Sequence, residues 1–324
     1  MSDFVLSPCA DPGWLLVEDG VDPARQREIE ALLAIGNGYL SARASIPEGS
    51  RFTRPATFVA GVYVSDRDLG PRLAVLPPWL HAEVMVEDQR LSLEAGRMLA
   101  HRRVLDLSQG VLWREWRQQD PSGRITRLTH LQLASLADRH LLLQSVAVTA
   151  ENYAGRIGLT AGLGSSNVTG TDVGELVSHS SAVLMRVSGT AIGVAAASQL
   201  QGVAASRITH HEDSANGRDE HWSWEVGLGE TARLERIIAV FTSRDIASPA
   251  TAARDHLAAT CAAGFSAAAS AHVDAWRDKW EAGEVLVIGD AQAQRALRFA
   301  TYHLIAAVNP VDEHVSIGAR GLTG

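Results

Sequence analysis

The heptapeptide IGLTAGL, residues 157–163, alternates apolar side chains with glycine or threonine. Successive side chains of a β-strand point to opposite faces of a sheet, so this pattern predicts a strand with one buried face. The same two-residue period recurs through most of residues 50–245. It is clearest around a predicted Asp88-Gln89 turn (Val84, Val86, Leu91 and Leu93) and from Trp222 to Leu228. Residues 234–241 are predicted to form a strand that is buried on both faces. Many short strands with few helical periods between them predict a mainly β chain, a large antiparallel sandwich.

The pattern changes after Ser243, where alanine-rich sequence with helical periodicity begins. Ser248-Pro249 predicts the start of a helix that ends at Gly264, and Ser266 predicts the cap of a second helix that ends at Gly283. A short strand is predicted for residues 285–288. Asp290 is predicted to cap a third helix, whose apolar residues are expected to be mostly buried: Leu297, Ala300, Tyr302, Leu304 and Ile305.

Composition limits the class of protein. The chain has 324 residues, 46% of them hydrophobic, which fits about two globular domains. Its net charge of −8 argues against nucleic acid as a partner. Cys9 and Cys261 are too far apart in sequence to suggest a metal pair or a disulfide framework. The N-terminal sequence resembles no signal peptide.

One uncharged run, residues 187–206, is interrupted by Ser, Gly, Gln and Thr. It is predicted to form two buried strands joined by a turn rather than a membrane span. We therefore expect a cytoplasmic protein without a membrane or nucleic-acid partner.

A second notable stretch is LLAIGNGYLSAR, residues 32–43, in which Gly36-Asn37-Gly38 interrupts an apolar run. Glycine tolerates positive φ and allows another backbone to approach closely, and Asn-Gly favours a hairpin turn. The residues favour a tight turn between two buried elements, and a ligand-binding loop is the alternative.

Several groups of residues could carry chemistry, and each also has a structural interpretation. The acidic pairs Asp66/Asp68 and Glu83/Glu87 resemble the paired carboxylates of glycosidases, but solvated positions explain them as well. Residues 162–170, GLGSSNVTG, resemble a phosphate loop in composition only, because they lack its lysine and a following helix.

The segment HHEDSANGRDEH, residues 210–221, could hold a metal ion. Its candidate ligands are His210, His211, Asp213 and His221. However, His210 and His211 would point to opposite faces of a strand, and an exposed hairpin loop at Asn216-Gly217 explains the segment without a metal.

Eight tryptophans could indicate stacking on sugar rings. Trp113 and Trp116 would lie on opposite faces of a strand, whereas Trp276 and Trp280 would share one helical face. Packing against the sandwich explains this spacing better than a sugar platform does.

Four parts of the chain, read in order, carry a resemblance to a known family. They are LLAIGNGYLSAR (32–43); TFVAGVYV (57–64) with LPPWL (76–80); LDLSQGVLWREW (105–116) with SLADRHLLLQSVAVTAENYAG (135–155); and VLVIGDAQAQRALRFATYHLIAAVNP (285–310) with SIGARGLTG (316–324). Together they resemble glycoside hydrolase family 65, the maltose, trehalose and kojibiose phosphorylases and their relatives. The first part looks like the NGYLG signature of that family. Ser41 and Ala56 stand where the family usually or often has glycine, so the disaccharide stays unassigned.

The resemblance implies an N-terminal, galactose mutarotase-like β-supersandwich over residues 1–246 and a helical linker over residues 247–283. Residues 290–324 would be the start of a six-fold α/α barrel. Because the sequence runs from the third helix through Asn309-Pro310 and stops at SIGARGLTG, it reads as cut within this barrel. Little chain is left to cover the apolar face of that helix.

The resemblance also implies the activity of the complete enzyme, which is inverting phosphorolysis or hydrolysis of an α-glucoside of the maltose, trehalose or kojibiose type. One glutamic acid would protonate the glycosidic oxygen while inorganic phosphate, a co-substrate, attacks the opposite face. That acid and the phosphate-binding loops would lie beyond residue 324. We therefore assign no catalytic, substrate-binding or metal-binding residue and no cofactor, and we expect residues 1–324 alone to be inactive.

The implied partners are the disaccharide, phosphate and the missing barrel domain, and a homodimer is implied by the resemblance alone. Two alternatives to a phosphorylase fragment stay open. One is a stand-alone carbohydrate-binding sandwich without catalysis, which direct binding of glucose or maltose would favour. The other is a truncated product without a function of its own. An uncovered third helix predicts self-association for the fragment and the truncated product alike.

Overall fold

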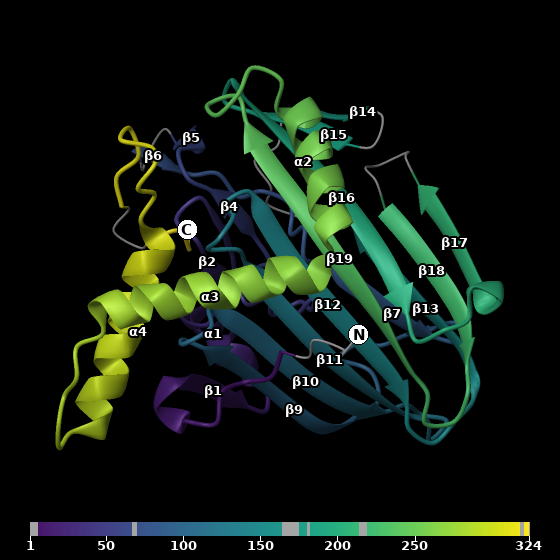
Figure 1. Ribbon diagram of the computed structural model, residues 1–324. Coiled ribbons are helices and arrows are strands. Elements are labelled where there is room, and N and C mark those ends of the chain that lie inside the picture. The colour runs from purple at the N-terminus through teal and green to yellow at the C-terminus, as the bar shows by residue number, and fades with distance from the viewer. Residues whose placement is uncertain are drawn as a thin grey trace.

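The computed structural model describes residues 6–66, 70–163, 175–179, 182–213, 219–317 and 321–323. These residues form mainly antiparallel β-sheet, as the two-residue period predicts (Figure 1). The largest sheet has the strand order β1 (Leu15–Asp19), β9 (Arg97–Asp106), β10 (Val111–Gln119), β11 (Ile125–Ala134), β12 (Leu141–Ala150), β19 (Thr231–Thr242), β16 (Thr190–Gln201), β15 (Ala182–Val187) and β14 (Glu175–His179). A second sheet has the order β17 (Ile208–Asp213), β18 (Asp219–Val226), β13 (Gly155–Gly162), β7 (Ala82–Val86) and β8 (Gln89–Arg90).

The two sheets face each other across an apolar core. Ile157, Leu159 and Ala161 of β13 are buried there, so the alternation of the opening heptapeptide is confirmed. Trp116 of β10 and Trp224 of β18 contribute the largest side chains to this core. The sandwich is therefore closed by the alternating apolar positions of both sheets.

Smaller elements connect and cover the sandwich. Short sheets are formed by β2 (Ile35–Gly36), β3 (Leu40–Ala42) and β4 (Thr57–Val59), and by β5 (Tyr63–Asp66) and β6 (Gly70–Leu73). The helices are α1 (Gln26–Leu32), α2 (Pro249–Ala263), α3 (Phe265–Gly283) and α4 (Ala291–Ala307), with single turns η1 (Pro12–Trp14), η2 (Pro23–Arg25) and η3 (Ala205–Arg207). No helix in the described part of the chain is both long and apolar enough to cross a membrane.

Helix α2 lies along the outer face of the large sheet, over β16 and β19 (Figure 1). It begins at Pro249 and ends before Gly264, as the cap residues predict. Ala253 and Leu257 are buried against the sheet. Gly193 permits this close approach, because a Cβ at that position would lie 2.3 Å from the backbone nitrogen of Ala250.

Helix α3 packs through the tryptophans that share one face. The indole nitrogen of Trp280 donates a hydrogen bond of 2.9 Å to the carbonyl of Leu107. Trp276 is fully buried and fills the space above Gly110, where a Cβ would lie 2.0 Å from its indole nitrogen. Trp113 and Trp116 belong to separate apolar clusters, as expected for opposite faces of β10.

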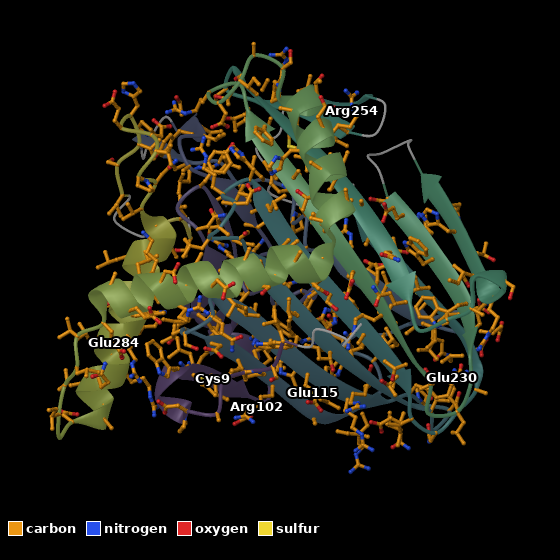
Figure 2. The ribbon with its side chains drawn as sticks, in the orientation of Figure 1. Cys9, Arg102, Glu115, Glu230, Arg254 and Glu284 are labelled. Atoms are coloured by element: carbon orange, nitrogen blue, oxygen red, sulfur yellow. The ribbon has the colours of Figure 1, made fainter. Side chains whose placement is uncertain are left out.

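Helix α4 begins after Asp290, whose carboxylate accepts hydrogen bonds from the backbone of Gln292 and Ala293, as predicted. In the middle of the helix, Arg298 pairs at 2.7 Å with Glu284, which lies at the junction between α3 and α4 (Figure 2). The helix contacts the remainder of the described residues along one side.

The expected burial of the α4 residues is confirmed for Tyr302, partial for Leu297 and Ile305, and wrong for Ala300 and Leu304. Tyr302 is fully buried, but Leu304 is 57% exposed and Ala300 is exposed. The helix presents an apolar side that the described residues do not cover.

Three further expectations need correction. Residues 285–288 form no strand, because the side chain of Gln294 bonds the backbone of Val285 and Val287 in place of a neighbouring strand. Leu228 lies beyond the end of β18 and is 69% exposed. In the run 187–206, β15 ends at Val187 and the single strand β16 covers most of the remainder.

Candidate functional site

The turn between β2 and β3 is held by the side chain of Asn37, which is 6% exposed. Its oxygen accepts hydrogen bonds from the backbone of Tyr39 at 3.0 Å and Leu40 at 2.7 Å. Its nitrogen donates to the carbonyls of Ser135 at 2.7 Å and Arg139 at 3.1 Å. The side chain therefore closes the turn and joins it to the segment between β11 and β12.

The glycines on either side of Asn37 place this turn against the end of α4. Gly38 has φ of +85° and donates a 2.7 Å hydrogen bond to the carbonyl of Ala306. A Cβ on Gly38 would lie 1.8 Å from the carbonyl oxygen of Val308, and one on Gly36 would lie 2.9 Å from that of Ala306. The tight turn is therefore present, and both glycines are needed for contact between the two backbones.

Replacing Asn37 with alanine should lower the free energy of unfolding by about 2–4 kcal/mol, because three buried backbone groups and one partly buried carbonyl lose their partner. Denaturant unfolding of the variant and the parent chain measures this loss. An unchanged midpoint, combined with altered sugar affinity in a longer family protein, would contradict the structural role of Asn37.

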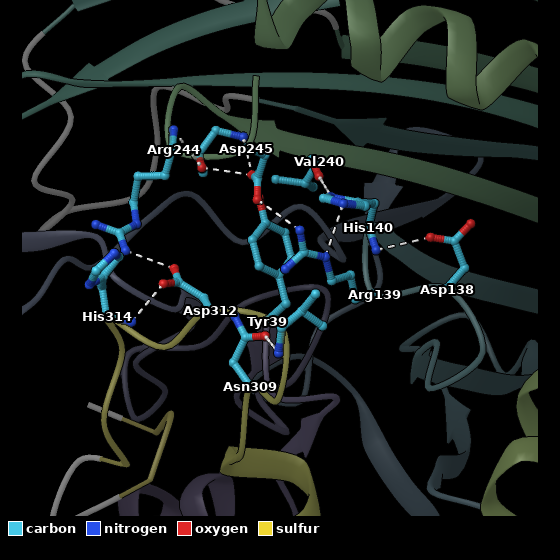
Figure 3. Close-up of polar contacts among 12 residues, drawn as sticks. Tyr39, Asp138, Arg139, His140, Val240, Arg244, Asp245, Asn309, Asp312 and His314 are labelled. Carbon is cyan, nitrogen blue, oxygen red and sulfur yellow. Dashed lines mark hydrogen bonds and ion pairs between the residues drawn. The ribbon is translucent and has the colours of Figure 1, made fainter. Parts of the chain in front are cut away.

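A partly buried polar network continues from this turn to the end of β19 (Figure 3). The hydroxyl of Tyr39 donates to Asp245, whose carboxylate also accepts from Thr242 at 2.8 Å and pairs with Arg139 at 3.0 Å. Burial, and then the charge of Asp245, raise the pKa of Tyr39 well above its usual value. Tyr39 therefore stays protonated and acts as a hydrogen-bond donor.

The segment after α4 is attached to the same region. Arg244, which follows β19, pairs with Asp312 at 2.7 Å, and Asp312 accepts from the backbone of His314 (Figure 3). These contacts fix the path of the chain from the end of α4 along the sandwich.

On the other side of the hairpin lies a cavity of about 1480 Å³. One wall is α4, including Phe299, Leu304 and Ala307, and the described C-terminal residues 321–323 form part of its edge. The remaining walls carry five arginines and two glutamates: Arg27, Arg43, Arg51, Arg54, Arg90, Glu83 and Glu94. The cavity thus has an apolar side and a positively charged side, in a chain whose net charge is −8.

The inner face of the large sheet carries a polar band that the sequence pattern did not reveal. Its members are His101, Arg103, Arg114, His130, Gln132, Gln144 and Arg236, and all are buried. Several of them bond to backbone carbonyls of the segments that cross the sheet. Gln144 donates to Leu80 at 2.6 Å, Arg236 donates to Trp79 at 2.9 Å, and Arg103 donates to Ala44 at 2.7 Å. We name these seven residues the inner polar band.

The inner polar band has a consequence for ligand binding. Buried polar groups need partners, and here segments 44–48 and 79–80 supply many of them. These segments contact the band, so the middle of the inner sheet face is covered by the chain itself.

Glu83 and Glu87 make separate contacts and do not form a catalytic pair. Glu83 contacts Arg90 at 2.8 Å and His81 at 3.2 Å, and the His81 hydrogen bond lowers the pKa of Glu83. Glu87 has φ of +53° in the β7–β8 turn and accepts from the backbone of Arg156. Asp68 and the side chain of Asp66 lie outside the described residues.

The histidine segment divides as the strand geometry predicts. His211 stacks on His221 at 4.7 Å between ring centres, whereas His210 stacks on Trp222. Among the described residues, no group of three metal-ligating side chains is found. The side chain of Asp213, the Asn216-Gly217 turn and residues 164–170 of the glycine-rich segment lie outside the described part.

The arginines of the cavity are the residues that the sequence did not single out. They come from α1, the end of β3, the loop before β4 and β8, and no local spacing connects them. Only the folded arrangement of the hairpin beside α4 places them around one cavity.

Comparisons with known proteins agree with this architecture. A family model described as "Glycosyl hydrolase family 65, N-terminal domain" matches residues 16–279. A kojibiose phosphorylase of Thermoanaerobacter brockii is 26% identical over 338 residues, which cover 97% of this chain and 44% of that protein. An uncharacterized glycosyl hydrolase of Mycobacterium tuberculosis is 30% identical over 349 residues, covering 97% of this chain and 26% of that protein.

A solved structure titled "Putative kojibiose phosphorylase from human microbiome" has the same fold, with a TM-score of 0.79 at 16% identity. The match covers 96% of this chain and 44% of that one. The chain thus spans less than half the length of these relatives.

Proposed function

Since this chain belongs to glycosyl hydrolase family 65, through the N-terminal domain of that family, we propose that it forms the N-terminal part of an inverting disaccharide phosphorylase. The family match over most of the chain carries this proposal. Kojibiose is the first candidate substrate because named relatives are kojibiose phosphorylases, and maltose and trehalose are the next candidates. Inorganic phosphate is the proposed co-substrate.

The proposed partner of this part is a helical catalytic domain that covers α4. Leu304 of α4 is 57% exposed and Ile317 is 49% exposed, and both line the cavity. Neighbouring apolar side chains exposed in this way favour contact with another folded surface. Relatives of more than twice the matched length have enough additional chain to supply that surface.

In this proposal the sandwich supports the catalytic domain and does not perform the chemistry. The hairpin residues Asn37 and Gly38 fix the end of α4, and Tyr39 and Asp245 connect that hairpin to the large sheet. Catalysis requires groups held accurately against the reacting atoms, so a fixed first barrel helix would benefit the whole site. A homodimer and a cytoplasmic location remain predictions.

We do not favour the alternative of a stand-alone carbohydrate-binding sandwich. A sugar on the inner sheet face would compete with segments 44–48 and 79–80 for the inner polar band. Saturable binding of glucose or maltose to residues 1–324 would favour that alternative.

Purified protein of residues 1–324 should show no phosphate-dependent cleavage of kojibiose, maltose or trehalose, because we assign no acid and no phosphate position for catalysis within it. Release of glucose 1-phosphate is the measurement. The control is a family protein extended through the catalytic region, which should cleave one of the three disaccharides. Cleavage by the shorter protein would contradict the proposed division of labour, and no cleavage by the extended control would contradict the proposed activity.

A further inference from the structure

The charged side of the cavity has two ends that differ in their pairing. At one end Arg90 pairs with Glu83 at 2.8 Å, and Arg51 lies 3.8 Å from Glu94. The two arginines there are matched by two carboxylates, so this end carries little excess charge.

The other end holds Arg27, Arg43 and Arg54, for which no ion pair is found among the described residues. Arg43 donates to two carbonyls, those of Arg54 at 3.2 Å and Thr323 at 3.0 Å, so its charge is hydrogen-bonded but not neutralised. The nearby carboxylate is Glu30, which is fully buried and accepts from the backbone nitrogen of Arg54 at 3.0 and 3.2 Å. Three arginines without an ion pair among the described residues therefore line this cavity.

The charges of Arg27, Arg54 and Glu30 all act on Arg43. Burial lowers the pKa of Arg43, and the charges of Arg27 and Arg54 lower it further against the opposing effect of Glu30. Like charges at close range repel, and an anion placed among them would relieve that repulsion. The excess is local, because the chain as a whole is acidic.

We propose that Arg27, Arg43 and Arg54 bind a phosphate group at this end of the cavity. Guanidinium groups present paired donors that match the oxygens of phosphate, and three arginines from α1, the end of β3 and the loop before β4 line this cavity. The apolar side of this cavity is α4, where the proposed catalytic domain packs, and the three arginines lie on its charged side. The choice of phosphate over other oxyanions rests on the proposed function, whereas the site itself rests on the arginines.

The test is a calorimetric titration of the 324-residue protein with inorganic phosphate, at an ionic strength held constant with chloride. We expect saturable binding to one site per chain. The double variant R27Q/R54Q should weaken this binding at least tenfold, because it removes two of the three proposed guanidinium donors. It should still fold, since both side chains are exposed and Arg54 contacts Glu30 only through its backbone. R51Q is the matched control, since Arg51 lies in the same cavity beside Glu94, and it should change the affinity less than twofold.

Two further titrations identify the form of the ligand. Glucose 1-phosphate that binds more tightly than inorganic phosphate identifies a sugar phosphate as the ligand, and equal affinity identifies the phosphate group alone. Acetate should bind at least tenfold more weakly than phosphate. Absence of saturable phosphate binding, equal binding of acetate, or equal losses in R27Q/R54Q and R51Q would overturn the proposal. None of these results depends on catalysis, so the proposed function can fail while this site holds.

Discussion

Replacing Gly38 with alanine should destabilise the protein by about 4 kcal/mol or more, a loss that single substitutions seldom reach. The added Cβ would lie 1.8 Å from the carbonyl oxygen of Val308, so the hairpin and the end of α4 could not keep their present distance. Separation would break the 2.7 Å hydrogen bond from Gly38 to Ala306 and open the buried surface of Tyr302. The positive φ of Gly38 adds a smaller cost of about 1 kcal/mol.

Gly229 provides the matched control for this prediction. Its φ of +74° resembles that of Gly38, but a Cβ at Gly229 would meet no atom within 4 Å. Gly229→Ala therefore measures the cost of the backbone conformation without the collision. Thermal and denaturant unfolding of both variants should show a loss several times larger for Gly38→Ala. Equal losses would mean that the hairpin does not contact α4 in solution.

The sandwich was predictable because its evidence is local. Alternation over residues 157–163 needs only a buried face, and Asp290 needs only the first turn of the helix that it caps. The wrong predictions concern segments whose structure depends on tertiary contacts. Residues 285–288 are apolar enough for a strand, but their backbone bonds to Gln294 and no strand lies beside them. Leu304 fits the apolar spacing of an amphipathic helix, but no described element covers its side chain.

The cavity could not be predicted for a related reason. Arg27, Arg43 and Arg54 are ordinary surface residues in sequence, and their convergence depends on how the β2–β3 hairpin sits beside α4. The same holds for Glu48 and Arg114, which are 66 residues apart and yet make two hydrogen bonds of 2.7 Å. The family resemblance indicated the fold and the class of enzyme, but no residue pattern indicated the three cavity arginines or the Glu48–Arg114 pair.

Removing the carboxylate of Glu48 should cost about 3–5 kcal/mol, because Arg114 would remain a buried cation without a counter-charge. Both side chains are 3% exposed, and the carboxylate accepts from both terminal nitrogens of the guanidinium. The neighbouring ring of His101 cannot replace the negative charge of Glu48, because an imidazole is either neutral or positively charged. Its ring accepts from Arg114 at 2.9 Å, and burial, with the charges of Arg114 and Arg103, lowers its pKa to about 3.

The comparison of Glu48→Leu, Arg114→Met and the double variant separates the cost of an unpaired charge from the value of the pair. Each single variant leaves one buried charge, whereas the double variant leaves none, so the double variant should be more stable than either single variant. Unfolding by denaturant at pH 7 measures all three. Glu28→Ala is the control, since the Arg25–Glu28 pair is more than half exposed and its loss should cost at most about 1 kcal/mol.

A double variant as unstable as the sum of the two single variants would contradict this account. In that case the pair would not be coupled, and the loop of Glu48 would be held by other contacts. Whether the Glu48–Arg114 pair holds this loop matters for the cavity. Gly49, Ser50 and Arg51 follow Glu48 directly and line the charged side of the cavity. If the buried pair anchors this loop, Glu48→Leu should also displace the Arg51 end of the cavity. In Glu48→Leu, the loss of binding free energy for phosphate at Arg27, Arg43 and Arg54 should then be smaller than the loss of unfolding free energy. The reason is that Glu30 holds the backbone of Arg54 independently of Glu48.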